Sequence, residues 1–229
     1  MKNLPIYDVL DDIKTTLNTE STLILEAPPG AGKSTVVPIS LLNESWLGNK
    51  VIIMLEPRRV AARMVAVQMA KLLGEEVGQS VGYQVKMESC YSKQTKLLVV
   101  TEAILVRKLQ SDQALEDVSM VIFDEFHERS IHTDLSLALC LQVQELLRDD
   151  LKLLIMSATL DSNELTNLLG KIPVINSKGK IYDVENIYLE TNIKQPDSKS
   201  INTLLLKITL KSIKEDEGDI LVFLAGSRE

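Results

Sequence analysis

One short segment near the start of the chain has the composition of a phosphate-binding loop. It runs Ala27-Pro-Pro-Gly30-Ala31-Gly32-Lys33-Ser34-Thr35. The glycines allow a tight turn in which backbone N–H groups and the start of the next helix point at phosphate oxygens. The lysine can reach the outer phosphates, and the serine hydroxyl can bind Mg²⁺. The segment therefore predicts a site for ATP and Mg²⁺, with the nucleotide held by Gly30, Ala31, Gly32, Lys33, Ser34 and Thr35.

The strict form of this motif starts with glycine, and this chain has Ala27 there. We give the difference little weight, because the inner segment from Gly30 to Ser34 carries the phosphate geometry. The alternative is an ordinary tight turn followed by an unrelated lysine. An apolar run before the segment and an amphipathic stretch after it favour the phosphate site, since this motif joins a strand to a helix.

A second group of chemically useful residues follows an apolar run about ninety residues later, in Asp124-Glu125-Phe126-His127. A carboxylate at the end of a strand beside a phosphate loop can hold Mg²⁺, so Asp124 is the expected metal partner of Ser34. Glu125 can accept a proton from an attacking water. Phosphoryl transfer needs positioning and charge neutralisation more than covalent chemistry, so Lys33, a metal ion and one base suffice. A solvated strand end is the alternative for the two acids alone, and the phosphate loop makes it the weaker interpretation.

The sequence His127-Glu128, with His132 after it, resembles a zinc-protease helix only superficially. That motif places its two histidines four residues apart. Here they are five apart, about 140° around a helix, so they would not share a face. We therefore exclude a zinc protease.

The elements that would position these residues alternate between short apolar runs and amphipathic stretches. The runs predict buried strands at Thr22–Glu26, Val51–Leu55, Leu97–Val100, Met120–Phe123 and Leu153–Met156. The stretches between them predict helices at Lys33–Leu42, Val60–Leu73, Glu102–Gln110 and Leu135–Leu147. Alternating strands and helices are typical of an α/β fold, in which helices cover both faces of a mostly parallel sheet.

The pattern changes after about residue 170. We expect strands at Ile172–Ile175, Val184–Leu189 and Ile220–Leu224, a polar linker at Asn192–Lys199 and a helix at Ile201–Lys214. A last strand so close to the end of the chain suggests a second domain that is cut short. The predicted division is a nucleotide-binding domain over 1–170, a strand pair and linker over 171–200, and the truncated start of a second domain over 201–229.

The composition limits the class of protein. Among 229 residues, 25 are Lys or Arg and 32 are Asp or Glu, for a net charge of −7. This balance argues against a protein that coats nucleic acid through general positive charge, but it leaves room for a narrow basic track. Two cysteines, Cys90 and Cys140, support neither a disulfide framework nor a zinc finger. No export signal and no apolar run of membrane-spanning length is present, so we expect a soluble, cytoplasmic protein.

The order and spacing of five segments resemble those of the DEAH-box RNA helicases. The segments are Gly30–Thr35, Glu56–Arg63, Thr101-Glu102, Asp124–His127 and Ser157-Ala158-Thr159. The forms Glu-Pro-Arg-Arg and Asp-Glu-Phe-His-Glu-Arg-Ser, with Gly82-Tyr-Gln-Val, are most similar to the bacterial HrpB-like branch. The resemblance covers residues 20–229.

This resemblance implies an ATPase built from two RecA-like domains, with ATP between them and single-stranded nucleic acid crossing both. It implies that Ser157 and Thr159 link the γ-phosphate site to domain movement and that His127 faces the second RecA-like domain. The second domain, with its arginine finger, would lie almost wholly beyond this chain, so we expect weak hydrolysis or none from the chain alone. The resemblance assigns nucleic-acid backbone contacts to Arg58, Arg59, Thr101 and Glu102.

The motifs predict a P-loop NTPase, and the resemblance implies that it is a RecA-like domain, the first motor domain of an ATP-dependent helicase. The resemblance favours RNA as the strand, although no motif here chooses RNA over DNA. One alternative is a nucleotide-gated module that binds nucleic acid or protein without unwinding. Another is a metabolic P-loop kinase, which the combination of Asp124-Glu125 with Ser157-Ala158-Thr159 disfavours.

Overall fold

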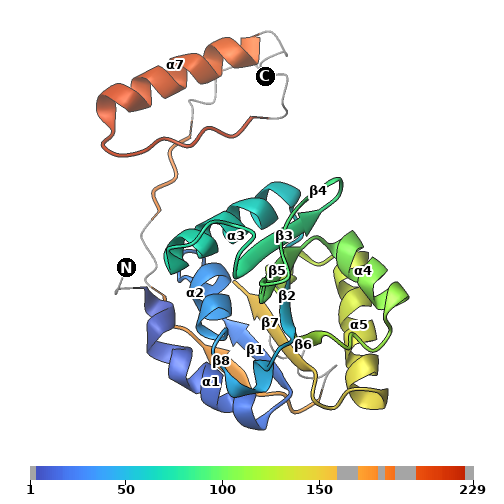
Figure 1. Ribbon diagram of the computed structural model, residues 1–229. Coiled ribbons are helices and arrows are strands. Elements are labelled where there is room, and N and C mark those ends of the chain that lie inside the picture. Colours follow the sequence, from blue (N-terminus) through green and yellow to red (C-terminus); the bar gives the residue numbers. More distant parts are fainter. Residues whose placement is uncertain (1–3, 159–169, 180–183, 189–199, 225–229) are drawn as a thin grey trace. The chain divides into compact units, whose positions relative to one another are not determined.

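The computed structural model describes residues 4–158, 170–179, 184–188 and 200–224. The chain divides into two units, Met1–Ile181 and Tyr182–Glu229. The first unit carries the candidate site and is an α/β domain (Figure 1).

The first unit is built on an eight-stranded sheet with the order β4-β3-β5-β2-β6-β7-β1-β8. Every neighbouring pair is parallel except β3 and β4, which form an antiparallel hairpin. This confirms the predicted α/β fold. The strands are β1 Thr22–Glu26, β2 Val51–Leu55, β3 Val81–Val85, β4 Glu88–Cys90, β5 Leu97–Val100, β6 Val118–Phe123, β7 Lys152–Ser157 and β8 Val174–Asn176.

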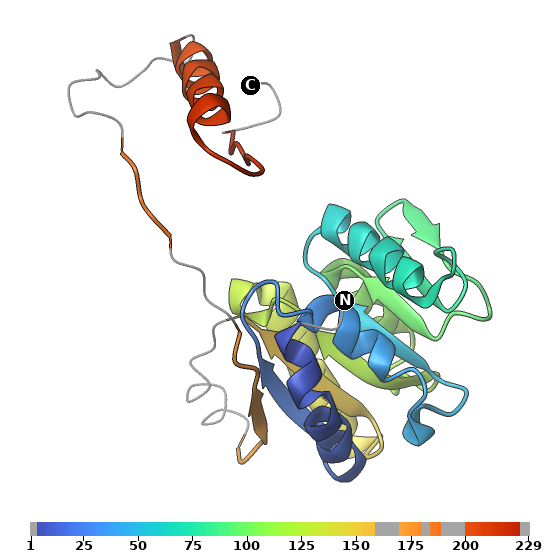
Figure 2. The ribbon, with the colours of Figure 1, turned by 90° about the vertical axis from the view of Figure 1, so that its left-hand side faces the viewer.

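Helices cover both faces of the sheet, with α1, α2 and α3 on one side and α4 and α5 on the other (Figures 1 and 2). Short 3₁₀ turns η1, η2 and η3 connect some of these elements. The helices and turns are η1 Pro5–Val9, α1 Leu10–Thr19, α2 Lys33–Ser40, η2 Ser45–Leu47, α3 Arg59–Leu73, α4 Glu102–Ser111, η3 Phe126–Glu128 and α5 Ile131–Leu146. In the second unit, α7 spans Ser200–Glu215.

Successive residues of the central strands point into two separate cores. In β1, Leu23 and Leu25 belong to the core under α1, α2 and α3, whereas Ile24 belongs to the core under α4 and α5. Each of these side chains is fully buried, which stabilises the fold by roughly 1.5–3 kcal/mol per side chain. Burial on both faces explains why the strands are continuous apolar runs instead of alternating ones.

Two predicted strands in the second unit are wrong. Residues 184–188 and 220–224 have no regular secondary structure, and Val184, Ile187 and Tyr188 are 80–85% exposed. A strand needs a neighbouring strand to satisfy its N–H and C=O groups, and the structure assigns none to these two segments. The predicted helix at 201–214 is confirmed by α7, and β8 lies at 174–176 instead of 172–175. No helix in the described part of the chain is long and apolar enough to span a membrane.

Candidate functional site

The five sequence segments meet at one edge of the sheet. They follow the carboxyl ends of β1, β2, β5, β6 and β7, which are parallel in adjoining positions. In open parallel sheets, ligands bind at this carboxyl edge. The topology therefore collects the segments at one site, although the first and the last of them are more than a hundred residues apart in sequence.

The phosphate loop connects β1 to α2, and its glycines occupy conformations that other residues avoid. Gly30 has φ 77°, and Gly32 has φ 98° and forms the N-cap of α2. A Cβ atom on Gly32 would lie 3.0 Å from Leu4 Cδ1 and 3.1 Å from Ile6 Cγ2. The loop is tied to its surroundings, since Ile6 N–H donates to the Ala31 carbonyl at 3.2 Å. The first N–H groups of α2 have no acceptor in an earlier turn, so they can bind an anion.

Lys33 and Glu125, both predicted as catalytic, contact each other. Lys33 is 4% exposed, and its Nζ lies 3.0 Å from Glu125 Oε1. Glu125 adopts a left-handed conformation with φ 49° and ψ 39°, which is uncommon for a residue other than glycine. This conformation ends β6 and begins η3. Local backbone strain of this kind occurs frequently at functional sites, where the surrounding structure maintains it.

Asp124 is a buried carboxylate with one unused oxygen. Its Oδ1 accepts the Glu125 N–H at 2.9 Å, whereas Oδ2 is buried without a hydrogen bond of ordinary geometry from the described residues. Burial raises the pKa of Asp124 to about 6, and the negative charge of Glu125 adds to this rise. The Ser34 hydroxyl and the Lys33 ammonium act in the opposite direction and lower that pKa.

This arrangement fits a magnesium ion. Mg²⁺ is usually held by one or two protein oxygens, and water and phosphate complete its six ligands. Ser34 and Asp124 supply such a pair beside the phosphate loop. No group of three or more His, Cys, Asp or Glu residues suited to a metal occurs in the described part of the chain, so a metal cage made wholly of protein ligands is not found there.

The turn after Glu125 is anchored by aromatic packing. Phe126 is 2% exposed and meets the ring of Phe123 edge to face, with ring centroids 6.3 Å apart. The guanidinium of Arg129 lies 5.4 Å from the centroid of the Phe126 ring. Arg129 also makes two hydrogen bonds of 3.0 Å with Asp134 of α5. These contacts fix the turn on both sides of its buried phenylalanine.

His127 connects this turn to the segment after β7. Its Nδ1 lies 3.4 Å from the Ala158 N–H and 3.4 Å from Glu125 Oε2. The Ala158 N–H requires an unprotonated Nδ1, whereas an ion pair with Glu125 requires a protonated one. Nδ1 therefore cannot make both contacts at the same time. Ser157 is buried at the end of β7, and Thr159 lies outside the described residues.

The two predicted nucleic-acid arginines lie where β2 leads into α3. Arg58 is exposed, and its Nη2 lies 2.6 Å from Glu128 Oε1. Arg59 donates from Nη2 to the carbonyl oxygen of Lys86 at 2.9 Å. The remaining two candidates, Thr101 and Glu102, lie at the N-cap and first turn of α4.

Glu102 makes contacts within the protein. Its Oε1 accepts hydrogen bonds from the hydroxyls of Ser130 at 2.6 Å and Thr133 at 2.7 Å. Ser130 also caps α5 by accepting the Thr133 N–H at 3.0 Å. The carboxylate thus joins the start of α4 to the start of α5.

Glu56 and Glu128 are site residues to which the sequence motifs gave no role. Glu56 is 3% exposed and accepts the Arg58 N–H at 3.3 Å. Burial raises its pKa to about 7, and the negative charge of Asp124 adds to this effect. The sequence did offer a signal for Glu56, because it is a carboxylate directly after a predicted buried strand, as Asp124 is.

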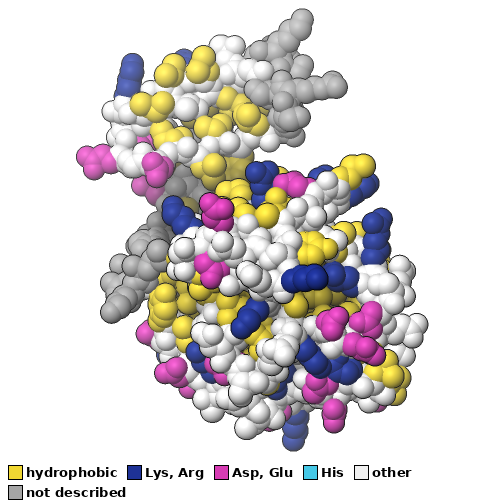
Figure 3. Space-filling model, in the orientation of Figure 1, with side chains coloured by type: hydrophobic (Ala, Val, Ile, Leu, Met, Phe, Trp, Pro, Cys, Tyr) yellow, Lys and Arg dark blue, Asp and Glu magenta, His cyan; other side chains and the backbone are white. Residues whose placement is uncertain are grey.

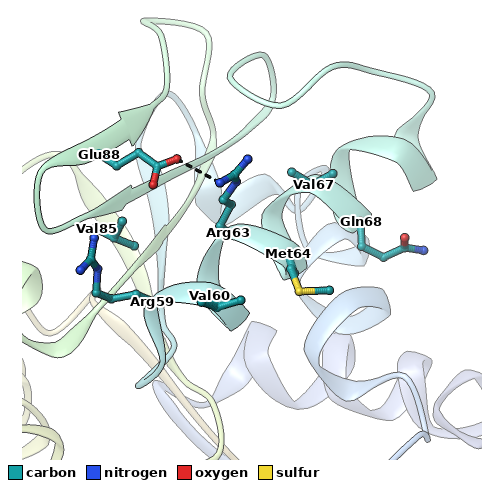
Figure 4. Close-up of a pocket in the computed structure, with 8 residues that line it drawn as sticks. All are labelled: Arg59, Val60, Arg63, Met64, Val67, Gln68, Val85 and Glu88. Carbon is teal, nitrogen blue, oxygen red and sulfur yellow. Dashed lines mark ion pairs between the residues drawn. The ribbon is translucent and has the colours of Figure 1, made fainter. Parts of the chain in front are cut away.

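A hollow of about 700 Å³ lies beside Arg59 on the exposed side of α3 (Figure 4). Arg63 reaches across it toward Glu88, at 3.6 Å. The other lining residues are the apolar Val60, Met64, Val67 and Val85 and the polar Gln68. On the face of the first unit seen in Figure 3, basic and acidic side chains are interspersed and form no single basic field. Arg58 and Arg59 are a local basic feature at the start of α3, for which the net charge of −7 left room.

Comparison with known proteins identifies the family. The model of the DEAD/DEAH box helicase family matches residues 11–168. The ATP-dependent RNA helicase HrpB of Escherichia coli (strain K12) is 45% identical over 229 residues, which are 100% of this chain and 28% of that protein. The ATP-dependent RNA helicase HrpA of Borreliella burgdorferi is 34% identical over 227 residues, which are 99% of this chain and 27% of that protein.

Solved structures agree with the sequence comparison. A crystal structure of the Escherichia coli DEAH/RHA helicase HrpB superimposes with a TM-score of 0.89 at 45% identity, over 99% of this chain and 28% of that one. A second crystal structure, of the Escherichia coli DExH-box NTPase HrpB, gives 0.80 over 100% of this chain and 28% of that one. The chain therefore spans little more than a quarter of these relatives and resembles their amino-terminal region. Because the family model matches well over half of its residues, the chain belongs to the DEAD/DEAH box helicase family.

Proposed function

We propose that this chain is the first motor domain of an ATP-dependent RNA helicase and that it binds and hydrolyses ATP with Mg²⁺. One observation carries the proposal. Lys33 and Glu125 are paired at 3.0 Å beside a buried Asp124 with an unused oxygen, all at the start of α2. A cation, a base and a metal ligand at a helix N-terminus are the groups that phosphoryl transfer to water needs.

Each residue has a separate task in this proposal. The N–H groups at the start of α2 hold the phosphates, and Lys33 moves from Glu125 to the outer phosphates. Glu125, released from Lys33, accepts the proton of the attacking water. Ser34 and Asp124 would hold Mg²⁺, which would neutralise charge on the phosphate oxygens. Gly30, Ala31, Gly32 and Thr35 complete the loop.

Three residues would pass the state of the phosphate site to a second RecA-like domain. His127 contacts the Ala158 N–H, so the turn that carries Glu125 is joined to the segment Ser157-Ala158-Thr159. We propose that Ser157 and Thr159 respond to the γ-phosphate and that His127 faces the partner domain. An arginine finger from that domain is worth roughly 10³ to 10⁵ in rate in related enzymes, so this chain alone should turn over slowly.

Single-stranded RNA would lie along the starts of α3 and α4. Arg58 and Arg59 offer guanidinium groups, and the amino terminus of α4 at Thr101 offers N–H groups, both of which suit backbone phosphates. The carboxylate of Glu102 already accepts hydrogen bonds from the hydroxyls of Ser130 and Thr133. It would therefore hold the amino terminus of α4 in place. We expect the cytoplasm as the compartment.

Titration with a fluorescent ATP analogue tests the nucleotide site. The wild-type chain should bind the analogue in a Mg²⁺-dependent way, and Lys33→Ala should weaken binding at least tenfold. Lys50→Ala is the matched control, because Lys50 forms a surface pair with Asp150 at 3.1 Å. Equal binding by the wild type and Lys33→Ala would refute the phosphate assignment.

A further inference from the structure

Arg58 and Glu128 form an ion pair between two segments of the carboxyl edge. Arg58 precedes α3, and Glu128 is the last residue of η3, the turn that starts from Glu125. Nη2 and Oε1 are 2.6 Å apart, while the side chains are 71% and 32% exposed. The pair is therefore short but accessible to solvent.

A carboxylate on a guanidinium presents the same kind of charged oxygen as a phosphate. The backbone of Arg58 is held independently, because its N–H donates to the buried carboxylate of Glu56. The side chain can thus exchange one oxygen partner for another while the backbone stays fixed. An exposed ion pair of this type favours the paired state over the separated side chains by roughly 1.5- to fivefold. A phosphate that binds Arg58 can therefore displace the carboxylate of Glu128.

We propose that Glu128 and a backbone phosphate of the bound strand compete for Arg58, and that this exchange transmits strand binding to Glu125. The inference rests on the proposed function, in which Arg58 contacts RNA. Glu128 is then a positioning residue, which acts on the reaction through another side chain.

The path from Glu128 to Glu125 is short. The Glu128 N–H donates to the Glu125 carbonyl oxygen at 2.9 Å, which closes the η3 turn. In this closed turn Glu125 has a left-handed backbone and contacts Lys33. Loss of the Arg58 partner removes one anchor of the turn. Strand binding at α3 can therefore alter the position of the candidate base without any direct contact between the two.

A double-mutant cycle tests the competition. The binding of a fluorescein-labelled single-stranded oligo(U) RNA is measured by anisotropy at low salt for the wild-type chain, Glu128→Gln, Arg58→Gln and the double variant. Glu128→Gln should bind about two- to fivefold more tightly, because Arg58 is freed. Arg58→Gln should bind more weakly, and adding Glu128→Gln to it should change nothing further.

Glu88→Gln is the matched control for the loss of one negative charge. Glu88 of β4 forms an exposed ion pair with Arg63 of α3, the helix that Arg58 precedes. If Glu128→Gln increased RNA affinity equally in the wild-type and Arg58→Gln backgrounds, the increase would come from general electrostatics. That result would overturn the proposed competition. Binding of the RNA by Glu128→Gln with wild-type affinity would overturn it as well. Normal strand binding by Arg58→Gln, or none by the wild type, would instead refute the proposed RNA role of Arg58, and this inference with it.

A second measurement tests the link to Glu125. Saturating oligo(U) should change the affinity of the wild-type chain for the fluorescent ATP analogue, and this change should shrink in Glu128→Gln. A role of Glu128 in folding alone would not alter this coupling. The same coupling in both proteins would overturn the transmission step.

Discussion

Gly32 allows a prediction whose size follows from the geometry of the phosphate loop. An alanine there would keep φ near 98°, which is strained for any side chain. Its Cβ would also lie 3.0–3.3 Å from side-chain carbons of Leu4, Ile6 and Val36. We assign about 1–2 kcal/mol to the backbone and about 1–3 kcal/mol to overpacking. Gly32→Ala should therefore lower the free energy of unfolding by about 2–5 kcal/mol.

Gly74→Ala separates the two contributions. Gly74 ends α3 with φ 75°, and a Cβ there would meet no atom within 4 Å. This variant should lose only the backbone contribution of about 1–2 kcal/mol. The measurement is urea unfolding followed by the fluorescence of Trp46, the single tryptophan of the chain, which packs against the core of the first unit.

The nucleotide assay gives an independent reading. Gly32→Ala should weaken the fluorescent ATP analogue at least tenfold, because its new side chain displaces the start of α2, whereas Gly74→Ala should bind it like the wild type. If Gly32→Ala were no less stable than Gly74→Ala, the tight packing under the loop would be wrong. Normal nucleotide binding by Gly32→Ala would refute the role of this backbone in holding phosphate.

Three further predictions concern buried or catalytic side chains. Glu125→Gln should keep nucleotide binding but lower ATP turnover at least 100-fold, since it removes the base, and retained turnover would exclude Glu125. The pKa of Glu56 rises to about 7 in the folded state, so the free energy of unfolding should fall as pH rises from about 4.5 through 7. In urea unfolding, Glu56→Gln should show a weaker dependence of this free energy on pH and should gain roughly 1–3 kcal/mol at pH 8. The same pH dependence in the wild type and the variant would contradict the burial argument. Cys140 is fully buried, and burial raises its pKa to about 12. A thiol reagent should therefore modify Cys90 in the native protein and Cys140 only in urea. Rapid labelling of both cysteines in the native protein would contradict this prediction.

The strands that the sequence predicted best are those buried on both faces. The bounds of β1, β2 and β5 agree with the apolar runs, because in a parallel sheet a central strand has no polar face to interrupt its pattern. The hairpin of β3 and β4 was not predicted, since Gly82 and Gln84 interrupt one strand and the other has three residues. Helix α1 was also missed, although Leu10, Ile13 and Leu17 have helical spacing.

The start of α5 was predicted too late, because its first turn lacks a regular apolar pattern. The prediction began at Leu135, where the apolar pattern becomes regular, whereas the helix begins at Ile131. After the exposed Ile131 its first turn is polar, with His132, Thr133 and Asp134, and Ser130 caps the helix by accepting the Thr133 N–H. In the second unit the error was the opposite one. The apolar run at 220–224 and the mixed segment at 184–188, with its Val, Ile and Tyr, resemble strands. A strand, however, depends on partners that local sequence does not specify.

For the site, sequence predicted which residues share the carboxyl edge but not which of them pair. Lys33 follows β1 and Glu125 follows β6, and β7 lies between these two strands in the sheet. Their 3.0 Å contact therefore depends on the left-handed turn at Glu125, which sequence alone does not reveal. Glu102 was predicted as a nucleic-acid contact, and that role stays a prediction. Its hydrogen bonds to Ser130 and Thr133 were beyond reach, because they join residues 28 and 31 positions away.

The pairing itself suggests how the site responds to its ligands. Two cations of the site are held by carboxylates, Lys33 by Glu125 and Arg58 by Glu128. In the proposed function, both ligands are polyanions, so each can bind only by exchanging a carboxylate for a phosphate. The exchange at Lys33 frees Glu125 to act as a base, and the exchange at Arg58 loosens the turn that carries Glu125. We therefore expect nucleotide phosphates to make the base available, and we expect strand binding at Arg58 to modulate its position and hence the rate of ATP turnover.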